Sequence, residues 1–282
     1  MSQTETDNLP FVTPEIKVAH SAASLAGDIL KKHFANLGDV SLSHDQKESW
    51  DLLTVADVEA ERAIIDCIKK EFPDHGCLAE ESSGETTDDH EHEKLWVIDP
   101  LDGTNNFAHG IPHFAVSIAY YKDSEPVLGV IYNPISNDWY IAGQGRGAWH
   151  NGTKVQVNNH RNLKETMIGV GFYYDRGEMM KSTLNAISQL FEQEIHGIRR
   201  MGTAALDLAQ VGLGCFGGYF EYKLKPWDFA AGRLFVEEAG GKVTDCSGQP
   251  LKLQPSTILA TNRLLHPPIL EIVERHIRNP ST

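Results

Sequence analysis

The stretch Trp96-Val-Ile-Asp-Pro-Leu-Asp-Gly-Thr-Asn-Asn-Phe107 combines an apolar run, two carboxylates and a glycine turn. The apolar residues predict a buried strand that ends at Asp99, and a short helix could begin at Gly103-Thr104. Asp99 and Asp102 offer the hard oxygen ligands that Mg²⁺ prefers, and the free N–H groups of a helix start can bind phosphate. A simpler alternative is a turn at a strand end in which both aspartates act as caps.

Two further acids stand at predicted element boundaries. Glu80 follows a candidate strand over residues 75–79, and Asp228 opens a predicted helix over residues 228–239. Taken alone, Asp228 is typical of a helix N-cap and Glu80 of a solvated loop. Together with Asp99 and Asp102 they form the set of carboxylates that a multi-metal phosphoryl-transfer site requires.

Two amphipathic helices are predicted ahead of these motifs. Helical periodicity covers residues 14–34. A second helix is predicted from an N-cap at Thr54 to Phe72, where Pro73 stops the pattern, and this places Asp57 in its first turn.

The rest of the chain predicts two halves of different architecture. Short strands at residues 114–121, 126–132 and 139–142 are typical of an antiparallel meander, and Asn151-Gly152 predicts a hairpin turn. After about residue 155, strands and helices alternate. We therefore expect an α+β half over residues 1–155 and an α/β half over residues 156–282.

The composition is that of an ordinary globular protein of 282 residues, 41% of them hydrophobic. With 39 acidic side chains against 25 Lys and Arg, the net charge of −14 argues against broad binding to nucleic acid or to an anionic membrane. No apolar run approaches the roughly 18 residues of a membrane span, and the N-terminus is unlike a signal peptide, so we expect a cytoplasmic protein. The four cysteines form no Cys-x-x-Cys pair, which predicts reduced thiols rather than a zinc site.

The motifs in this order resemble those of the inositol monophosphatase family. The resemblance is carried by Leu78-Ala-Glu-Glu-Ser82, by the stretch at residues 96–107, and by Trp227-Asp-Phe-Ala-Ala-Gly232 followed by Glu237-Glu-Ala-Gly-Gly241. It runs from about residue 13 to residue 277. The fold that it implies is an α/β protein built as a layered α/β/α/β/α sandwich of the inositol monophosphatase and fructose-1,6-bisphosphatase type.

The resemblance also implies a role for each matching residue. The implied metal ligands are Glu80, Asp99, the Leu101 carbonyl, Asp102 and Asp228, and the implied substrate contacts are Asp102, Gly103, Thr104, Gly202, Thr203, Ala204, Glu221 and Asp228. Glu80 would help to activate water and the Thr104 hydroxyl would orient it, while Asp57 would hydrogen-bond Thr104. Most metal ligands then belong to the N-terminal half, and the C-terminal half supplies Asp228 and the substrate wall. One departure is Gln46, with Lys47 beside it, where the family often has lysine.

The activity that the resemblance implies is Mg²⁺-dependent hydrolysis of a small phosphate monoester, with inositol monophosphate as the first candidate and about two to three Mg²⁺ ions per site. Metal-activated water would attack phosphorus in line, without a phosphoenzyme. Fructose-1,6-bisphosphate, histidinol phosphate and a nucleotide 3′-phosphate stay open as substrates, as does a regulatory or binding protein without turnover. A haloacid-dehalogenase-type phosphatase is disfavoured. The two acids of such an enzyme are separated by one residue, as Asp-x-Asp, whereas two residues separate Asp99 and Asp102. We expect a homodimer, a small-molecule phosphate ester as partner, no direct nucleic-acid binding and no membrane.

Overall fold

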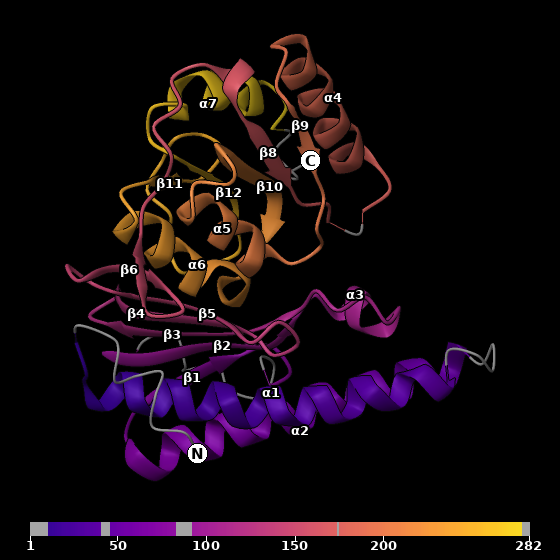
Figure 1. Ribbon diagram of the computed structural model, residues 1–282, viewed down its shortest axis with the longest axis vertical. Helices are drawn as coiled ribbons and strands as arrows, with labels where there is room; N and C mark the ends of the chain where they lie inside the picture. The colour runs from indigo at the N-terminus through magenta and orange to yellow at the C-terminus, as the bar shows by residue number, and fades with distance from the viewer. Residues whose placement is uncertain (1–10, 41–45, 83–91, 174, 278–282) are drawn as a thin grey trace.

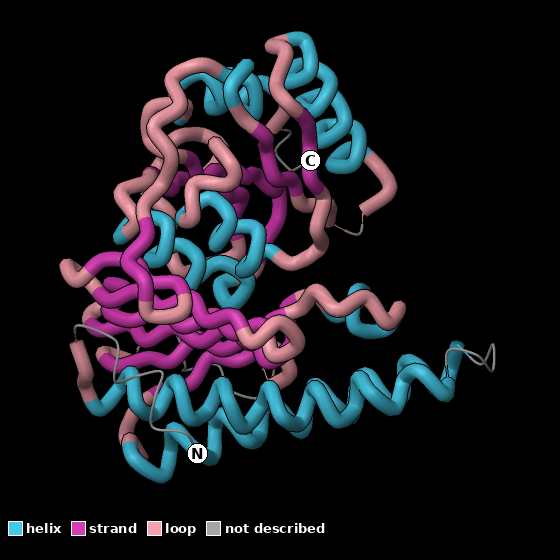
Figure 2. The backbone as a smooth tube through the Cα atoms, viewed as in Figure 1, coloured by secondary structure: helices cyan, strands magenta, loops and turns pink. Residues whose placement is uncertain are grey.

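The protein is described here as a computed structural model covering residues 11–40, 46–82, 92–173 and 175–277. Five layers of secondary structure are stacked, as Figures 1 and 2 show: a helix pair, a sheet, a second helix pair, a second sheet and a third helix pair. The predicted α/β/α/β/α sandwich is confirmed. Among the described residues, no helix has the length and apolar composition needed to cross a membrane.

The first two layers come from the N-terminal part of the chain. Helices α1 (Pro14–Val40) and α2 (Gln46–Glu71) pack together and cover one face of a seven-stranded sheet. The strands lie in chain order: β1 (Gly76–Ala79), β2 (Lys94–Asp102), β3 (Ala115–Lys122), β4 (Glu125–Asn133), β5 (Asp138–Gly143), β6 (Gly147–His150) and β7 (Thr153–Val155). Only β1 and β2 are parallel among these neighbours.

The other three layers come from the C-terminal part. The second sheet has the order β11 (Lys242–Thr244), β12 (Ser256–Thr261), β10 (Gly218–Leu224), β8 (Met167–Val170) and β9 (Gly197–Arg199). Helices α5 (Ala204–Gly212) and α6 (Pro226–Glu238) lie between the two sheets, and α4 (Glu178–Glu192) and α7 (His266–Arg275) cover the outer face. Two short helices, α3 (Thr104–Ala108) and the 3₁₀ turn Leu163–Glu165, lie in connections.

The sequence of the middle helices reflects their position between two sheets. Eight of the nine residues of α5, which reads Ala-Ala-Leu-Asp-Leu-Ala-Gln-Val-Gly, are buried. A helix that is apolar on all sides is one that is covered on all sides. One hydrophobic cluster joins α5 and α6 to the first sheet and another joins them to the second. These helices therefore fix how the two sheets are placed, although the division of the chain into halves at residue 155 stays a prediction.

The structure confirms the Asn151-Gly152 hairpin, since both residues have the positive φ that this turn requires, 47° and 75°. It corrects the start of the second helix. Thr54 is not an N-cap, because α2 begins at Gln46, and Asp57 therefore lies well inside the helix. Gln46, Lys47 and Glu48 are good helix formers that lengthen the helix ahead of the apolar pattern.

The structure also corrects the end of the strand that carries the two aspartates. Strand β2 continues through Asp102 instead of ending at Asp99. Its register against β3 shifts, because Asp99 pairs with Ser117 and Asp102 with Ala115, so three steps on β2 face two on β3. Residues three apart on a regular strand point to opposite faces, and one extra residue returns them to the same face. This bulge, which contains Pro100, lets both carboxylates face one pocket.

Candidate active site

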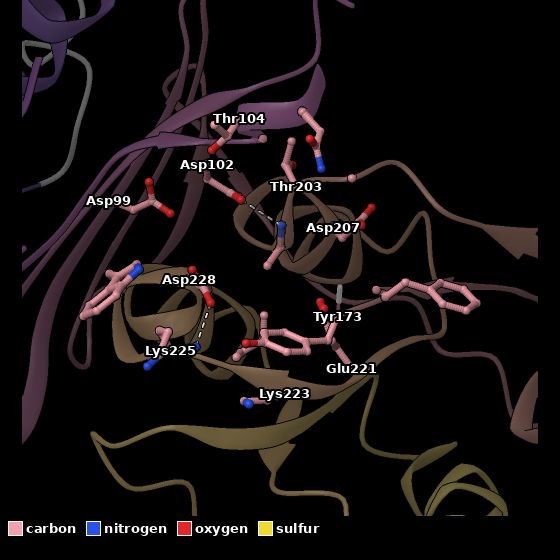
Figure 3. A pocket seen from close by; sticks show the side chains of 18 of the residues that line it. Asp99, Asp102, Thr104, Tyr173, Thr203, Asp207, Glu221, Lys223, Lys225 and Asp228 are labelled. Carbon is pink, nitrogen blue, oxygen red and sulfur yellow. Dashed lines mark hydrogen bonds between the residues drawn. The ribbon is translucent and has the colours of Figure 1, made fainter. Parts of the chain in front are cut away.

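A cavity of about 300 Å³ lies where the ends of several elements meet. It is lined by the predicted residues Glu80, Asp99, Leu101, Asp102, Gly103, Thr104, Gly202, Thr203, Ala204, Glu221 and Asp228, and these come from both halves of the chain. Figure 3 shows Thr104, Asp102 and Asp99 on one side of the pocket and Lys223 on the opposite side. Asp57 is the one predicted residue that does not line it.

Asp102 joins the end of β2 to the start of α5. Its carboxylate accepts hydrogen bonds from the backbone N–H of Ala205 at 2.7 Å and of Ala204 at 3.3 Å (Figure 3). Thr203 is the N-cap of α5, but its side chain makes no capping bond. Asp102 therefore satisfies the free N–H groups of a helix more than 100 residues away in sequence, and the positive end of the helix dipole stabilises its charge.

The other three acids are held at element ends. The Asp99 carboxylate is buried and its Oδ1 accepts the Leu101 N–H at 3.0 Å. Glu80 follows β1, and its backbone N–H donates to Ile98 on β2 at 3.2 Å. Asp228 is the third residue of α6, where its Oδ2 accepts the Lys225 N–H at 2.7 Å. The predicted N-cap role of Asp228 is corrected: Lys225 is the N-cap of α6, and Asp228 binds the N-cap N–H from the first turn while it faces the pocket.

The four carboxylates are held close in a poorly solvated place, and this disfavours their charged forms. Burial, followed by the charges of Asp228 and Glu81, raises the pKa of Glu80 to about 7. Burial raises the pKa of Asp228 to about 6, and it raises the pKa of Asp99 and of Asp102 well above the usual range. Such a group of acids is stable in its ionised form only with cations nearby.

The donor chemistry of the pocket fits Mg²⁺. Four carboxylates and the Leu101 carbonyl provide hard oxygen atoms. In the described ranges, no three His, Cys, Asp or Glu side chains converge as a preformed metal cluster. Bound cations would remove the repulsion between the carboxylates.

The turn after Asp102 requires glycine. Gly103 has a φ of +102°, and a Cβ atom there would lie 2.7 Å from Thr203 Cγ2 and 3.1 Å from the His113 carbonyl oxygen. The Thr104 hydroxyl donates to the Leu101 carbonyl at 3.2 Å. The turn therefore brings the backbone of two segments close together directly beside the acids.

The expected hydrogen bond between Asp57 and Thr104 is not found among the described residues. Asp57 is buried, and its Oδ1 has no hydrogen-bond partner there. Burial and the charges of Glu81, Glu80 and Glu61 raise the pKa of Asp57 to about 9. Asp57 therefore belongs electrostatically to the acids around Glu80. The side chains of Gln46 and Lys47 lie outside the described residues.

The predicted substrate wall comes from the loop before α5 and from β10. Glu221 is buried, and its Oε2 accepts the Tyr219 hydroxyl at 2.7 Å. Burial raises the pKa of Glu221 to about 7. The Thr203 hydroxyl is buried and has no hydrogen-bond partner within the described chain. These polar groups are available to a ligand with several hydroxyls.

Several pocket residues were not anticipated from the sequence. Asp207 on α5 is 1% exposed, and its Oδ1 has no partner among the described residues. An aspartate in the otherwise apolar stretch Ala204–Gly212 is a signal that could have identified it. The pocket is also lined by Arg200, Tyr173, Lys223 and Lys225. Alternation along the strand after Glu221 would have predicted Lys223 on the same face.

Relatives correct one expectation about partners. The chain is 41% identical over 250 residues to a protein of Escherichia coli (strain K12) named Nus factor SuhB, and the match covers 88% of this chain and 91% of that protein. The name of this relative, a Nus factor, contradicts the expectation of no direct nucleic-acid binding, and that expectation is wrong. The expectation was based on the net charge of −14, and a whole-chain sum does not describe a local surface or contacts made through another protein.

Solved structures and a family profile agree with the fold. An inositol monophosphatase of Anabaena sp. PCC 7120 superposes with a TM-score of 0.80 at 36% identity, covering 92% of this chain and 94% of that one. A staphylococcal enzyme, SaIMPase-II with inositol monophosphate bound, superposes with a TM-score of 0.76 at 30% identity, covering 92% and 94%. The profile of the inositol monophosphatase family matches residues 12–278. The chain therefore belongs to the inositol monophosphatase family.

Proposed function

We propose that this protein is a Mg²⁺-dependent phosphatase that hydrolyses a small phosphate monoester, with an inositol phosphate as substrate and the monophosphate as its simplest form. The observation that carries the proposal is the group of four carboxylates, Glu80, Asp99, Asp102 and Asp228, that converge on one pocket from different elements of the fold. The solved relative that binds inositol monophosphate supports the choice of ester.

Five groups would hold the metal ions: the carboxylates of Glu80, Asp99, Asp102 and Asp228, and the Leu101 carbonyl. When bound, Mg²⁺ supplies positive charge that stabilises the phosphoryl and leaving-group oxygens and makes water more acidic. The number of ions per site, two to three, is part of the proposal.

The chain's own residues would position the reactants and move one proton. Glu80 lines the pocket with Asp99 and Asp228, and its carboxylate would accept a proton from the attacking water. The Thr104 hydroxyl lies beside the metal ligands and would orient that water. Asp57 is buried beside Glu80 and would help to balance the charge of the acids around Glu80. No phosphoenzyme is required.

The same residues would orient the ester. Backbone groups of Gly103 and Thr104 would contact the phosphate, and Asp102 and Asp228 would accept hydrogen bonds from hydroxyls next to it. Gly202, Thr203, Ala204 and Glu221 line the same pocket and would contact the polyol ring. The buried Thr203 hydroxyl has no hydrogen-bond partner among the described residues, and a substrate hydroxyl can pair with it.

Phosphate release from inositol 1-phosphate with Mg²⁺ tests the proposal. Asp99→Asn removes a buried negative charge with little change of shape, and we expect at least about a hundredfold loss of kcat. The matched control is Asp66→Asn, an exposed position on α2. Circular dichroism and the melting temperature show whether both variants are folded. Activity that survives in folded Asp99→Asn would refute the assignment.

A panel of esters tests the substrate separately. It contains inositol 1-phosphate, fructose-1,6-bisphosphate, histidinol phosphate and a nucleotide 3′-phosphate. Faster turnover of a sugar, histidinol or nucleotide ester than of inositol 1-phosphate would overturn the inositol assignment and leave the mechanism intact. The cytoplasmic location and the homodimer stay predictions.

A second candidate function is a role with the transcription machinery. It is supported by the identity of 41% to a protein named as a Nus factor. The two functions are compatible, because the carboxylates of the pocket do not occupy the outer surface. A transcription readthrough assay of wild type and Asp99→Asn separates the two functions. Equal readthrough with the two proteins shows that the transcription role does not need the pocket.

A further inference from the structure

Three cations line the pocket besides the acids. Arg200, Lys223 and Lys225 all line the cavity. Within the part of the chain that the structure describes, none of the three forms an ion pair with a carboxylate. Arg200 and Lys225 are exposed, whereas Lys223 is half-buried. An anionic ligand in the pocket would supply the counterion that Lys223 does not have within the described chain.

The direction of Lys223 follows from the alternation of β10. Glu221 points into the pocket, and Tyr222 points to the other face, where its hydroxyl donates to the Val273 carbonyl at 2.8 Å. Lys223 returns to the pocket side. The register of β10 against β12 shifts between Glu221 and Leu224, so the ladder is interrupted beside Lys223.

Tyr173 holds the Lys223 side chain in place. The ammonium nitrogen lies 4.3 Å from the centre of the Tyr173 ring, within the range of a cation–π interaction. Both residues line the pocket, and they come from different segments, the loop after β8 and the end of β10. In Figure 3 the pair lies across the pocket from Thr104 and Asp99. Tyr173 thus holds the Lys223 ammonium group away from the acids, and the scissile phosphate is proposed to bind at the acids.

We propose that Lys223, held against Tyr173, binds a second phosphate of the substrate, so that the site prefers phosphate esters with another phosphate on the far side of the molecule. The inference rests on the proposed function and refines its substrate class. A single phosphate at the metal end leaves Lys223 without an anion, whereas a bisphosphate reaches both ends of the pocket. Lys225 and Arg200 add positive charge to the lining of the same pocket and favour anionic ligands.

The test compares two esters, inositol 1,4-bisphosphate, whose phosphates lie across the ring, and inositol 1-phosphate. We expect wild type to have the higher kcat/KM for the bisphosphate. Lys223→Ala should lower the ratio of the two kcat/KM values about tenfold, which corresponds to about 1.4 kcal/mol. Lys223→Arg should keep most of the preference. The matched control is Lys122→Ala, because Lys122 pairs with Lys94 at the opposite end of β3 from the pocket.

Variants of Tyr173 test whether the lysine is held by the ring. Tyr173→Phe keeps an aromatic face and should keep the ratio, whereas Tyr173→Leu should lower it in the same direction as Lys223→Ala. A ratio that is the same in wild type and in folded Lys223→Ala overturns the inference and leaves the proposed function standing. If neither ester is hydrolysed, the proposed function fails. The inference is then tested by calorimetric Kd values for the bisphosphate. If Lys223→Ala does not raise this Kd, the inference is refuted.

Discussion

Replacing Gly103 by alanine should both destabilise the protein and disturb the site. Gly103 lies between the proposed metal ligand Asp102 and Thr104, with a φ of +102°. An added Cβ would meet Thr203 Cγ2 at 2.7 Å, the His113 carbonyl oxygen at 3.1 Å and the Phe114 Cα at 3.2 Å. The two backbone atoms cannot rotate away, so the turn must shift.

Two costs add in this variant. A residue with a side chain in this backbone region costs about 1–2 kcal/mol, and overpacking of a tight site costs about 1–3 kcal/mol. The free energy of unfolding should therefore fall by about 2–5 kcal/mol. Thr203→Ser removes the methyl group that makes the closest contact, so the double variant should recover about 1 kcal/mol of the packing cost. It should not recover the backbone cost.

Urea unfolding of the two single variants and the double variant measures both costs, and phosphate release follows the site. Gly110→Ala is the matched control, because Gly110 has a φ of +69° and nothing within 4 Å of an added Cβ. It should therefore show the backbone cost alone. The packing argument is wrong if Gly103→Ala is no less stable than Gly110→Ala. It is also wrong if Thr203→Ser changes the stability of wild type and of Gly103→Ala by the same amount.

Three further predictions concern pH, a buried amide and the metal. The pKa of His266 is lowered to about 4 by burial and by Lys242, and its ring bonds the hydroxyls of Thr244 and Thr261. Because only the unfolded chain takes up this proton between about pH 6.5 and 4, stability should fall as the pH falls through that range, and equilibrium unfolding of His266→Gln should show a shallower slope. Asn106 Nδ2 donates to the carbonyls of His113 at 2.7 Å and Met201 at 2.9 Å, so Asn106→Ala should cost about 1–3 kcal/mol in urea, and a loss near zero would contradict this. Mg²⁺ at about 100 times its Kd should stabilise wild type by about 2.7 kcal/mol. EDTA should reverse this rise in melting temperature, and Asp228→Asn should reduce it; an equal rise in that variant would count against Asp228 as a ligand.

Local sequence patterns were sufficient for most elements and for the acids of the site. Helical and alternating periodicity predicted the helix at the N-terminus, the meander and the Asn151-Gly152 turn, because these features depend on residues close together in the chain. The motifs at residues 78–82, 96–107 and 227–232 identified the family and its carboxylates. The start of α2 was missed, because polar residues of high helix propensity carry no apolar pattern.

The geometry of the pocket depended on contacts between distant segments. A bulge in β2 turned Asp99 and Asp102 to one face, and its position is visible only from the pairing with β3. Asp102 caps α5 by accepting the N–H of Ala205, which lies 103 positions later in the chain. Asp207, Tyr173 and Lys223 joined the site because α5, the loop after β8 and β10 end at the same cavity.

The sequence by itself determined the family, because its motifs are properties of residue type and local spacing, and the resemblance implied the layered fold and the acids proposed to bind metal. Only the tertiary structure decided which side chains share the pocket and which of them lack a partner. The net charge of −14 illustrates the difference, since it is a sum over the chain, whereas Arg200, Lys223 and Lys225 all line the pocket that holds the acids. Electrostatic interactions depend on distance and burial, and the fold sets both.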